Sequence, residues 1–382
     1  ANTAIVKIPE IKMNESKKNR LIAEARTLRA LYYFNLVRFF GDVPLILDLK
    51  TVEDSKGPRD SKELIYDQII EDLTFAEEHL PLRSEYSASD EGRINKGAAK
   101  ILFGKVYLTK GDFQKAKDKL AEVVEHESEY GFGLHKDYHA NWLRDTEAGI
   151  EAVLYIEYKE PPFQHNGEMA LAGPKYSIPG SLGISALNEA DIPTQELYDQ
   201  FDNRDLRKKT NFKTEFAHLK TGEILKSSIP LSGKFWVEGL ETGDRCDVNM
   251  HIIRYADAIL MYAEALNEVG ESTKALAMLN RIRERAFGDD SGNFKPMSKD
   301  EFRTAILNER RLEFPHEGHR WFDLVRTGTF IQRMKEHSAY EAKVAEANKT
   351  EIAQNIKEHM ILMPIPQSEI DLNPNLVQNA GY

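Results

Sequence analysis

The stretch from Ala23 to Leu45, AEARTLRALYYFNLVRFFGDVPL, is the strongest indicator of the fold in this sequence. Hydrophobic residues recur in it and just before it at three- and four-residue spacing, as in an amphipathic helix. They are Leu21, Ala25, Leu28, Tyr32, Leu36 and Phe39, and Leu31, Phe34, Val37 and Phe40 widen the stripe almost to the full circumference. Gly41 and Pro44 then end the helix. We predict a buried core helix, in which truncation of Leu28 or Leu36 to alanine costs about 2–5 kcal/mol if the side chain is buried.

Composition limits the class of protein. The 382 residues are 41% hydrophobic and 30% charged, which suits a large core and an ordinary polar surface. A formal net charge of −11 argues against nucleic acid as a partner, since phosphate binding needs a basic face. Cys246 is the only cysteine, so an internal disulfide and a cysteine-rich metal site are excluded. No apolar run approaches the roughly 20 residues of a membrane-spanning helix.

Two segments share a tetratricopeptide-like pattern of paired helices. The first is INKGAAKILFGKVYLTKGDFQKAKDKLAEVV, and the second, YADAILMYAEALNEVGESTKALAMLNRIRERA, repeats it at an offset of 159 residues. Small residues, Gly104 and Ala263, occupy the position of close helix contact in the two segments. The other matched pairs are Phe103 with Tyr262, Tyr107 with Leu266, Gly111 with Gly270, Ala116 with Ala275, and Leu120 with Leu279. The pattern departs from the tetratricopeptide repeat at Lys100, where a tryptophan is usual.

These patterns predict a mostly α fold with a tetratricopeptide-like helix-pair scaffold. We expect a single domain over residues 1–382, with helix pairs at about 23–80, 95–126, 251–287 and 298–335. Between about residues 127 and 250, glycines, prolines and scattered aromatics replace the helical stripe. This indicates a long, irregular, loop-rich insertion with at most short strands or helices, one of them a strand at Ala152 to Tyr158. Because long structured loops on a rigid scaffold are often functional, the insertion is where we expect the ligand.

The candidate catalytic groups favour structural roles. His316 and His319 are three residues apart, whereas a zinc-protease helix needs two histidines four apart. Glu309 and Glu313 lie one helical turn apart beside arginines, which is typical of a salt-bridge network, whereas the two carboxyls of a glycosidase normally come from separate elements. We therefore expect no enzyme activity, no catalytic residue, no metal and no cofactor.

Five sequence blocks carry a family resemblance. AEAR, AAK, RYAD, ERR and PIP occur in that order, and the chain closes with LMPIPQSEIDLNPNLVQNAGY. Together they resemble the SusD/RagB family over roughly residues 20 to 382. That family consists of outer-membrane lipoproteins that capture nutrients, chiefly glycans, for a TonB-dependent transporter. In it a signal peptide and a lipid-carrying cysteine provide the membrane anchor, and neither is in this chain.

The resemblance implies a cell-surface protein of the outer membrane that captures an oligosaccharide or polysaccharide. The helical part would dock on a SusC-like TonB-dependent barrel, and the loops would face the glycan. Some relatives are thought to take peptides. The alternative function, from another class, is a tetratricopeptide scaffold that binds a peptide or protein partner in its groove.

Aromatic residues of the insertion are the candidate ligand contacts, because sugar rings stack their apolar faces on exposed aromatic rings. Trp236 is flanked by Gly233, Lys234, Glu238 and Gly239, in a loop with no evident core to fill, and is the first candidate. Tyr176 and Phe163 are weaker candidates. The competing interpretation is that Trp236 pins the loop to the scaffold. Trp142 and Trp321 are expected to pack in the interior.

Overall fold

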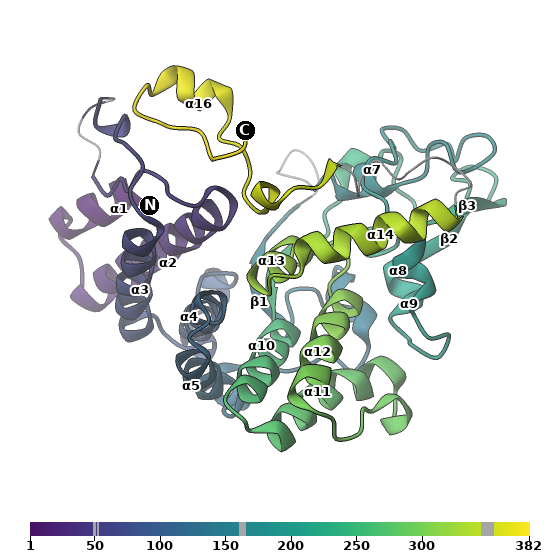
Figure 1. The fold of residues 1–382 in the computed structure, drawn as a ribbon, viewed down its shortest axis with the longest axis horizontal. Coiled ribbons are helices and arrows are strands. Elements are labelled where there is room, and N and C mark those ends of the chain that lie inside the picture. Colours follow the sequence, from purple (N-terminus) through teal and green to yellow (C-terminus); the bar gives the residue numbers. More distant parts are fainter. Residues whose placement is uncertain (49–50, 52, 160–165, 345–354) are drawn as a thin grey trace. The chain divides into compact units, whose positions relative to one another are not determined.

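The computed structural model describes residues 1–48, 51, 53–159, 166–344 and 355–382. Within these ranges the chain is mostly helical, with two antiparallel two-stranded sheets (Figure 1). It divides into two compact units. Unit 1 comprises Ala1–Gly131 and Trp321–Tyr382, and unit 2 comprises Phe132–Arg320. The single-domain organisation expected from the sequence stays a prediction.

Unit 1 is built on two helix pairs. Helix α2 (Glu15–Phe40) packs along α3 (Lys62–His79), and α4 (Lys96–Lys110) packs along α5 (Phe113–Val124), as Figure 1 shows for the purple and blue helices. Each of these helices begins at a residue whose side chain accepts a backbone N–H, which stabilises the helix start. These capping residues are Asn14, Ser61, Asn95 and Asp112. The unit also contains the short helices α1 (Asn2–Lys7), α6 (Glu127–Tyr130) and α16 (Gln367–Leu372), and the longer helix α14 (Phe330–Val344).

The burial of α2 differs from the sequence-based prediction. Its buried hydrophobic residues include Ile22, Ala23, Ala30, Leu31, Phe34 and Val37. Tyr32 and Leu36 are instead 59% and 40% exposed, and both line a hollow of about 810 Å³ in unit 1. The face of α2 toward α3 carries Arg29, which forms a buried two-pronged ion pair with Asp72 at 2.7 Å. The expected burial of Leu36 was wrong, because Leu36 lies on the face of α2 that borders the hollow.

The closing segment of the chain is fastened to the end of α2. Met363 N–H donates to the Phe39 carbonyl at 2.7 Å, and the Asn379 side-chain amide donates to the carbonyls of Phe40 and Met363. Arg59 donates to the Phe40 carbonyl and to Asn379 Oδ1. Since carbonyls at a helix C-terminus lack partners within the helix, these bonds satisfy groups that the helix itself leaves open.

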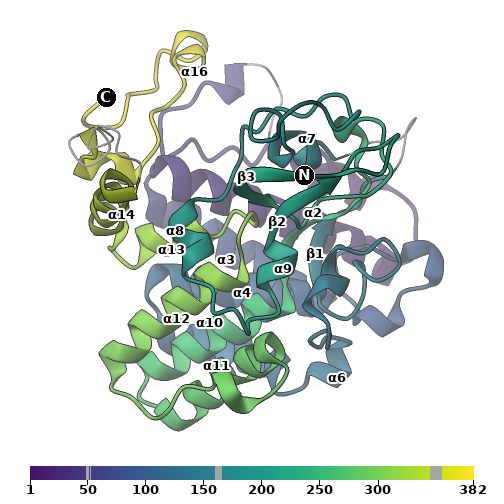
Figure 2. The same ribbon diagram turned by 90° about the vertical axis from the view of Figure 1, so that its right-hand side faces the viewer.

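Unit 2 contains the remaining regular helices and both sheets. Helices α10 (Tyr255–Glu268), α11 (Ser272–Phe287) and α12 (Lys299–Glu313) pack together, and α13 (Arg320–Arg326) begins at the boundary of the unit. Strand β1 (Ala152–Ile156) pairs with β4 (Met250–Arg254), and β2 (Phe212–Ala217) pairs with β3 (Ile224–Ser232), all antiparallel. Short helices α7 (Glu168–Ala172), α8 (Gln195–Asp199) and α9 (Lys208–Asn211) complete the insertion, and Figure 2 shows them around the β2–β3 hairpin. Residues 251–254, expected to be helical, are the end of β4, which runs directly into α10.

The two matched sequence segments are both helix hairpins with the same turn. In the first, Asp112 N–H donates to the Tyr107 carbonyl at 3.0 Å, and in the second, Glu271 N–H donates to the Leu266 carbonyl at 2.9 Å. Gly111 has φ +78° and Gly270, at the matched position, has φ +89°. This left-handed conformation favours glycine, so the repeated glycine has a physical cause. The fold is thus a tetratricopeptide-like helix-pair scaffold with a loop-rich insertion.

Candidate functional site

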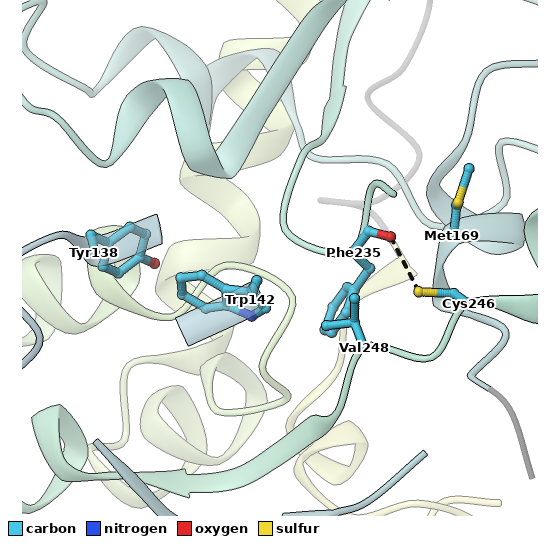
Figure 3. Close-up of a cluster of buried hydrophobic side chains, with 6 residues drawn as sticks. All are labelled: Tyr138, Trp142, Met169, Phe235, Cys246 and Val248. Atoms are coloured by element: carbon cyan, nitrogen blue, oxygen red, sulfur yellow. Dashed lines mark hydrogen bonds between the residues drawn. The ribbon is translucent and has the colours of Figure 1, made fainter. Parts of the chain in front are cut away.

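The insertion has an interior of its own, formed by side chains from distant parts of the sequence. The first cluster consists of Tyr138, Trp142, Met169, Phe235, Cys246 and Val248, each at most 4% exposed (Figure 3). Cys246 Sγ donates a weak hydrogen bond to the Phe235 carbonyl at 3.5 Å. Burial raises the pKa of Cys246 to about 11, so its thiol stays protonated and unreactive near neutral pH. Trp142 is packed in the interior, as predicted.

A second cluster lies under the β2–β3 hairpin and explains the position of Trp236. Ile178, Leu182, Leu187, Phe216 and Leu231 form this cluster. Trp236 is half-buried and packs against both clusters. Its ring meets that of Phe216 edge to face, with centroids 4.7 Å apart and a 74° interplanar angle. The expectation that this loop has no core to fill was wrong, because residues far away in sequence supply that core.

Tyr176 has the opposite environment. Its side chain is 75% exposed, yet its backbone is held firmly. The Glu189 carboxylate accepts hydrogen bonds from the N–H groups of Lys175, Tyr176 and Ser177 at 3.0, 3.3 and 3.0 Å. Although burial opposes it, this hydrogen bonding with Ser177 and its neighbours holds the pKa of Glu189 below its usual value. The result is an exposed aromatic ring on a fixed loop.

The site residues predicted from the sequence are therefore in three situations. Trp236 is half-buried, Tyr176 is exposed, and Phe163 lies outside the described residues. Lys234, expected to be polar company for Trp236, is only 1% exposed and lies inside unit 2. Of the two described aromatics, Tyr176 offers the larger free surface. Their assignment to a ligand site stays a prediction.

Trp321, in unit 1, is half-buried, and its ring meets that of Phe330 edge to face.

A buried network of charges supports the insertion from within unit 2. Arg254, just before α10, contacts Glu313 at 3.0 Å and Glu317 at 2.7 Å, and it also pairs with Glu151. Arg285 of α11 contacts Glu313 at 2.5 Å and Glu151 at 3.1 Å. These side chains are at most 4% exposed. Charges buried to this degree need such partners to remain ionised.

The same network includes the carboxylates that were candidates for catalysis. Arg207 contacts Glu309 at 2.8 Å and Glu313 at 2.9 Å. Burial alone would raise the pKa of Glu313, but Arg285, Arg254 and Arg207 bring it down to about 2. A carboxylate so strongly held in its charged form does not serve as a general acid near neutral pH. The predicted ion-pair role of Glu309 and Glu313 is confirmed.

Lys234 ties the loop of Trp236 to this network. Its ammonium group lies 2.5 Å from Glu317 and 4.5 Å from the ring centroid of Trp142. Burial lowers the pKa of Lys234 to about 8, with the charge of Glu317 acting in the opposite direction. Glu317 thus holds both Lys234 and Arg254, residues that are far from it in the sequence. This connection positions the Trp236 loop and could not be read from local spacing.

The helix-pair scaffold and its loop-rich insertion define a class of binding protein, and comparisons with known proteins give the family. The model described as SusD family matches residues 228–382, and the model described as starch-binding associating with outer membrane matches residues 1–108. SusD-like protein P2 of Formosa agariphila is 31% identical over 421 residues, an alignment that covers 100% of this chain and 78% of that protein. The chain belongs to the SusD-like family.

Solved structures agree with this assignment. A SusD superfamily protein from Parabacteroides distasonis superposes with a TM-score of 0.83 at 28% identity, covering 100% of this chain and 83% of that one. A laminarin-binding SusD-like protein has a TM-score of 0.79 at 28% identity, with the same coverage.

A further sequence relative is starch-binding protein SusD of Bacteroides thetaiotaomicron, which is 24% identical over 437 residues, covering 97% of this chain and 74% of that protein. Among the described residues, no helix is both long and apolar enough to cross a membrane.

Proposed function

We propose that this protein captures a glycan, an oligosaccharide or polysaccharide, without catalysing its breakdown. Membership of the SusD-like family supports this, together with relatives whose names specify starch or laminarin binding. The carboxylates of the ERR block support the non-catalytic part, because Glu309 and Glu313 are buried and bound to arginines. The buried network would therefore hold the binding surface in shape.

The observation that carries the proposal is the exposed ring of Tyr176. A neutral sugar offers apolar C–H faces and many hydroxyls, so its site needs a fixed aromatic ring beside short polar groups. Tyr176 is fixed through Glu189, and the hydroxyls of Ser177 and Ser227 lie nearby, 2.8 Å apart. Trp236 would act mainly by holding the loop in place. A preformed ring loses little conformational entropy on binding.

The finer proposal is that the glycan passes to a SusC-like TonB-dependent transporter of the outer membrane. The family resemblance suggests this partner and an N-terminal lipid anchor that is outside the given chain. Tethering beside the transporter would raise the effective concentration of the captured glycan, so a modest affinity would suffice. Co-purification of the lipidated protein with such a barrel from outer membranes tests this step separately from glycan binding.

Calorimetric titration with laminarin and starch oligosaccharides tests the binding proposal. Stacking on an aromatic ring is worth about 1–3 kcal/mol by analogy with nucleobases, so Tyr176→Ala should weaken binding by roughly 5- to 150-fold. Tyr32→Ala is the matched control, because Tyr32 is a 59% exposed tyrosine on α2 of unit 1. It should leave the affinity unchanged.

Two results would contradict the proposal. Equal affinities of wild type and Tyr176→Ala, with both proteins melting alike, would remove Tyr176 from the site. Steady release of reducing ends from a polysaccharide, abolished in Glu309→Gln, would replace the binding function with a glycosidase. Trp236→Ala serves as a third variant. Because the Trp236 ring packs on two clusters, this change should lower the melting temperature clearly while changing the glycan affinity little.

A further inference from the structure

Three side chains from separate segments of unit 2 converge at one point. Glu168 begins α7, Asp191 lies in the loop that follows α7, and His316 lies in the turn after α12. One ligand atom from each, a carboxylate oxygen or an imidazole nitrogen, lies within 4.8 Å of the other two. His316 Nδ1 and Asp191 Oδ2 are 3.6 Å apart, which is too far for a normal hydrogen bond.

The imidazole of His316 faces this point with an unused nitrogen. Its side chain is 7% exposed, and its Nδ1 atom is buried without a hydrogen-bond partner among the described residues. Buried polar atoms in folded proteins usually have a partner, so this nitrogen, which lies near two carboxylates, is available to a ligand. The Asp191 side chain is 60% exposed, which leaves the point open to solvent on one side.

Hydrogen bonds that do not involve these three side chains fix the backbone that carries Glu168 and Asp191. The Asn166 side chain accepts from Glu168 N–H at 2.8 Å and donates to the Val248 carbonyl at 2.9 Å, which ties the start of α7 to the segment before β4. Asp191 N–H donates to the Leu171 carbonyl of α7 at 3.0 Å. The cluster is therefore held by its backbone and does not depend on mutual attraction of its side chains.

The turn that carries His316 is held independently as well. His316 has φ +60°, an unusual conformation for a residue other than glycine. The next residue, Glu317, is anchored by ion pairs with Lys234 and Arg254. Those buried contacts fix the turn, and the turn directs the His316 imidazole toward the two carboxylates.

We propose that Glu168, Asp191 and His316 form a binding site for a divalent transition-metal ion such as Zn²⁺. One imidazole and two carboxylates suit Zn²⁺ or Mn²⁺, whereas Ca²⁺ and Mg²⁺ take oxygen ligands. Zn²⁺ lies about 2.0–2.2 Å from nitrogen and oxygen ligands, so two ligand atoms on one ion are roughly 3–4 Å apart. The observed separations need only a small inward movement, which the exposed Asp191 side chain can make.

The electrostatics of the three groups fit a cation. Burial, and after it the charge of Asp191, raises the pKa of Glu168 above its usual value. Burial lowers the pKa of His316, with Asp191 opposing and Lys234 reinforcing this effect. A neutral imidazole is the form that binds a metal. A dication between the carboxylates would relieve their mutual repulsion.

The bound ion would connect α7, the loop at Asp191 and the turn after α12 inside unit 2. From the sequence we expected no metal, because His316 and His319 have the wrong spacing for a shared ion. The partners proposed here lie far from His316 in the sequence, so that spacing does not bear on them. The proposal is independent of glycan binding, and either can fail without the other.

The test uses the untagged protein, stripped of metal with a chelator and titrated calorimetrically with ZnCl₂, MnCl₂ and CaCl₂. We expect one equivalent of Zn²⁺ to bind, more tightly than Ca²⁺, and to raise the melting temperature. Loss of any one ligand, in Asp191→Asn, Glu168→Gln or His316→Asn, should weaken Zn²⁺ binding by at least about tenfold, since even removal of a ligand's supporting partner has that effect. Asparagine tolerates the left-handed conformation of His316, so the third variant keeps the turn.

Glu241→Gln is the matched control, because it removes one exposed negative charge elsewhere in the insertion. It should leave Zn²⁺ affinity unchanged. The visible d–d absorption of Co²⁺ added in place of Zn²⁺ should have the intensity of a four- or five-coordinate ion in wild type, and in His316→Asn it should fall toward that of hydrated Co²⁺. The proposal is overturned if no saturable Zn²⁺ binding occurs, or if binding persists equally in all three ligand variants. A fall in stability of Asp191→Asn without metal binding would show that Asp191 and His316 form only an ion pair, which also overturns it.

Discussion

The two helix hairpins, α4–α5 and α10–α11, have the same backbone conformation at their turns but differ in the residues that surround them. Their turns make the same hydrogen bonds at matched positions, as described above for Asp112 and Glu271. Lys100 on α4 corresponds to Ile259 on α10, which is fully buried. Lys100 instead forms ion pairs with Glu77 and Glu122, and these three side chains are 13–39% exposed. One group of charges beside α10 and α11, formed by Arg254, Arg285, Glu151 and Glu313, is almost completely buried.

A repeat pattern therefore specifies the hairpin, whereas the surroundings of each charge determine how much it contributes to stability. In unit 1 the hairpin is flanked by ion pairs that water still reaches, and such pairs contribute about 0–1 kcal/mol. In unit 2, Arg254 and Arg285 are enclosed with Glu151 and Glu313. Removal of one partner there leaves an uncompensated buried charge, at a cost of about 3–5 kcal/mol.

The largest predicted effect is that of Glu313→Gln. This change leaves Arg207, Arg254 and Arg285 without a carboxylate that each of them contacts at 3.0 Å or less. We expect the free energy of unfolding to fall by about 3–5 kcal/mol. Urea denaturation of wild type and variant at neutral pH measures it. A loss below 1 kcal/mol would mean that the buried network contributes no more than the exposed pairs beside α5.

The next effect concerns the close approach of the helices in the first hairpin. A Cβ atom at Gly104 would lie 2.5 Å from Leu120 Cγ, which is closer than two non-bonded carbon atoms approach in proteins. Gly104→Ala should therefore destabilise the protein by about 1–3 kcal/mol, even though alanine favours a helix. Leu120→Ala removes the obstructing atoms, so the double variant should be more stable than the two separate losses predict.

Position 263 provides the control for this cycle. Ala263, at the position matched to Gly104, is fully buried, and Ala263→Gly should cost about 1–2 kcal/mol through lost helix propensity and lost methyl burial. If the losses in the free energy of unfolding caused by Gly104→Ala and Leu120→Ala were strictly additive, α4 and α5 would not be in contact at these residues. Thermal and urea denaturation of the four proteins in the cycle give the coupling energy.

The pH dependence of stability should also distinguish the buried charge network from the exposed ion pairs. The pKa of Glu313 is about 2 in the folded protein, against an ordinary value of 4.5. Its folded pKa is depressed, so its contribution is present above about pH 4.5 and is lost as the pH falls toward 2. Across that window the unfolded state binds about one more proton, and stability changes by roughly 1.4 kcal/mol per pH unit. Glu313→Gln should flatten the stability profile there, whereas an unchanged slope would contradict the assignment.

The scaffold was predictable from the sequence because its signals are local. The spacing of apolar residues and the glycine at each turn act within one or two helical turns. The capping box that Ser298 and Glu301 form at the start of α12 is equally local. The exposure of Leu36 was mispredicted for a different reason. Apolar spacing around α2 was nearly uniform, so it could not indicate which face meets α3 and which lines the hollow.

The candidate sites were less predictable because their contacts are long-range. Trp236 is half-buried by Phe216 and by clusters that include Trp142 and Met169, and no local pattern links these residues. The group of Glu168, Asp191 and His316 likewise comes together only through folding. Tyr176 was predicted only as a weaker candidate, because it is an aromatic residue of the insertion. Its support by Glu189 became visible only in the structure.

The smallest predicted effect is that of Glu122→Gln, the counterpart of Glu313→Gln in the other hairpin. Glu122 is 39% exposed and contacts both Lys100 and Lys119. Glu77 also contacts both lysines, so neither loses its last carboxylate, and water reaches the site. We expect a loss of less than about 1 kcal/mol, shrinking further at high salt because exposed charges are screened. The stability of Glu313→Gln should depend far less on salt. If Glu122→Gln matched Glu313→Gln in both size and salt response, burial would not be what separates the two hairpins.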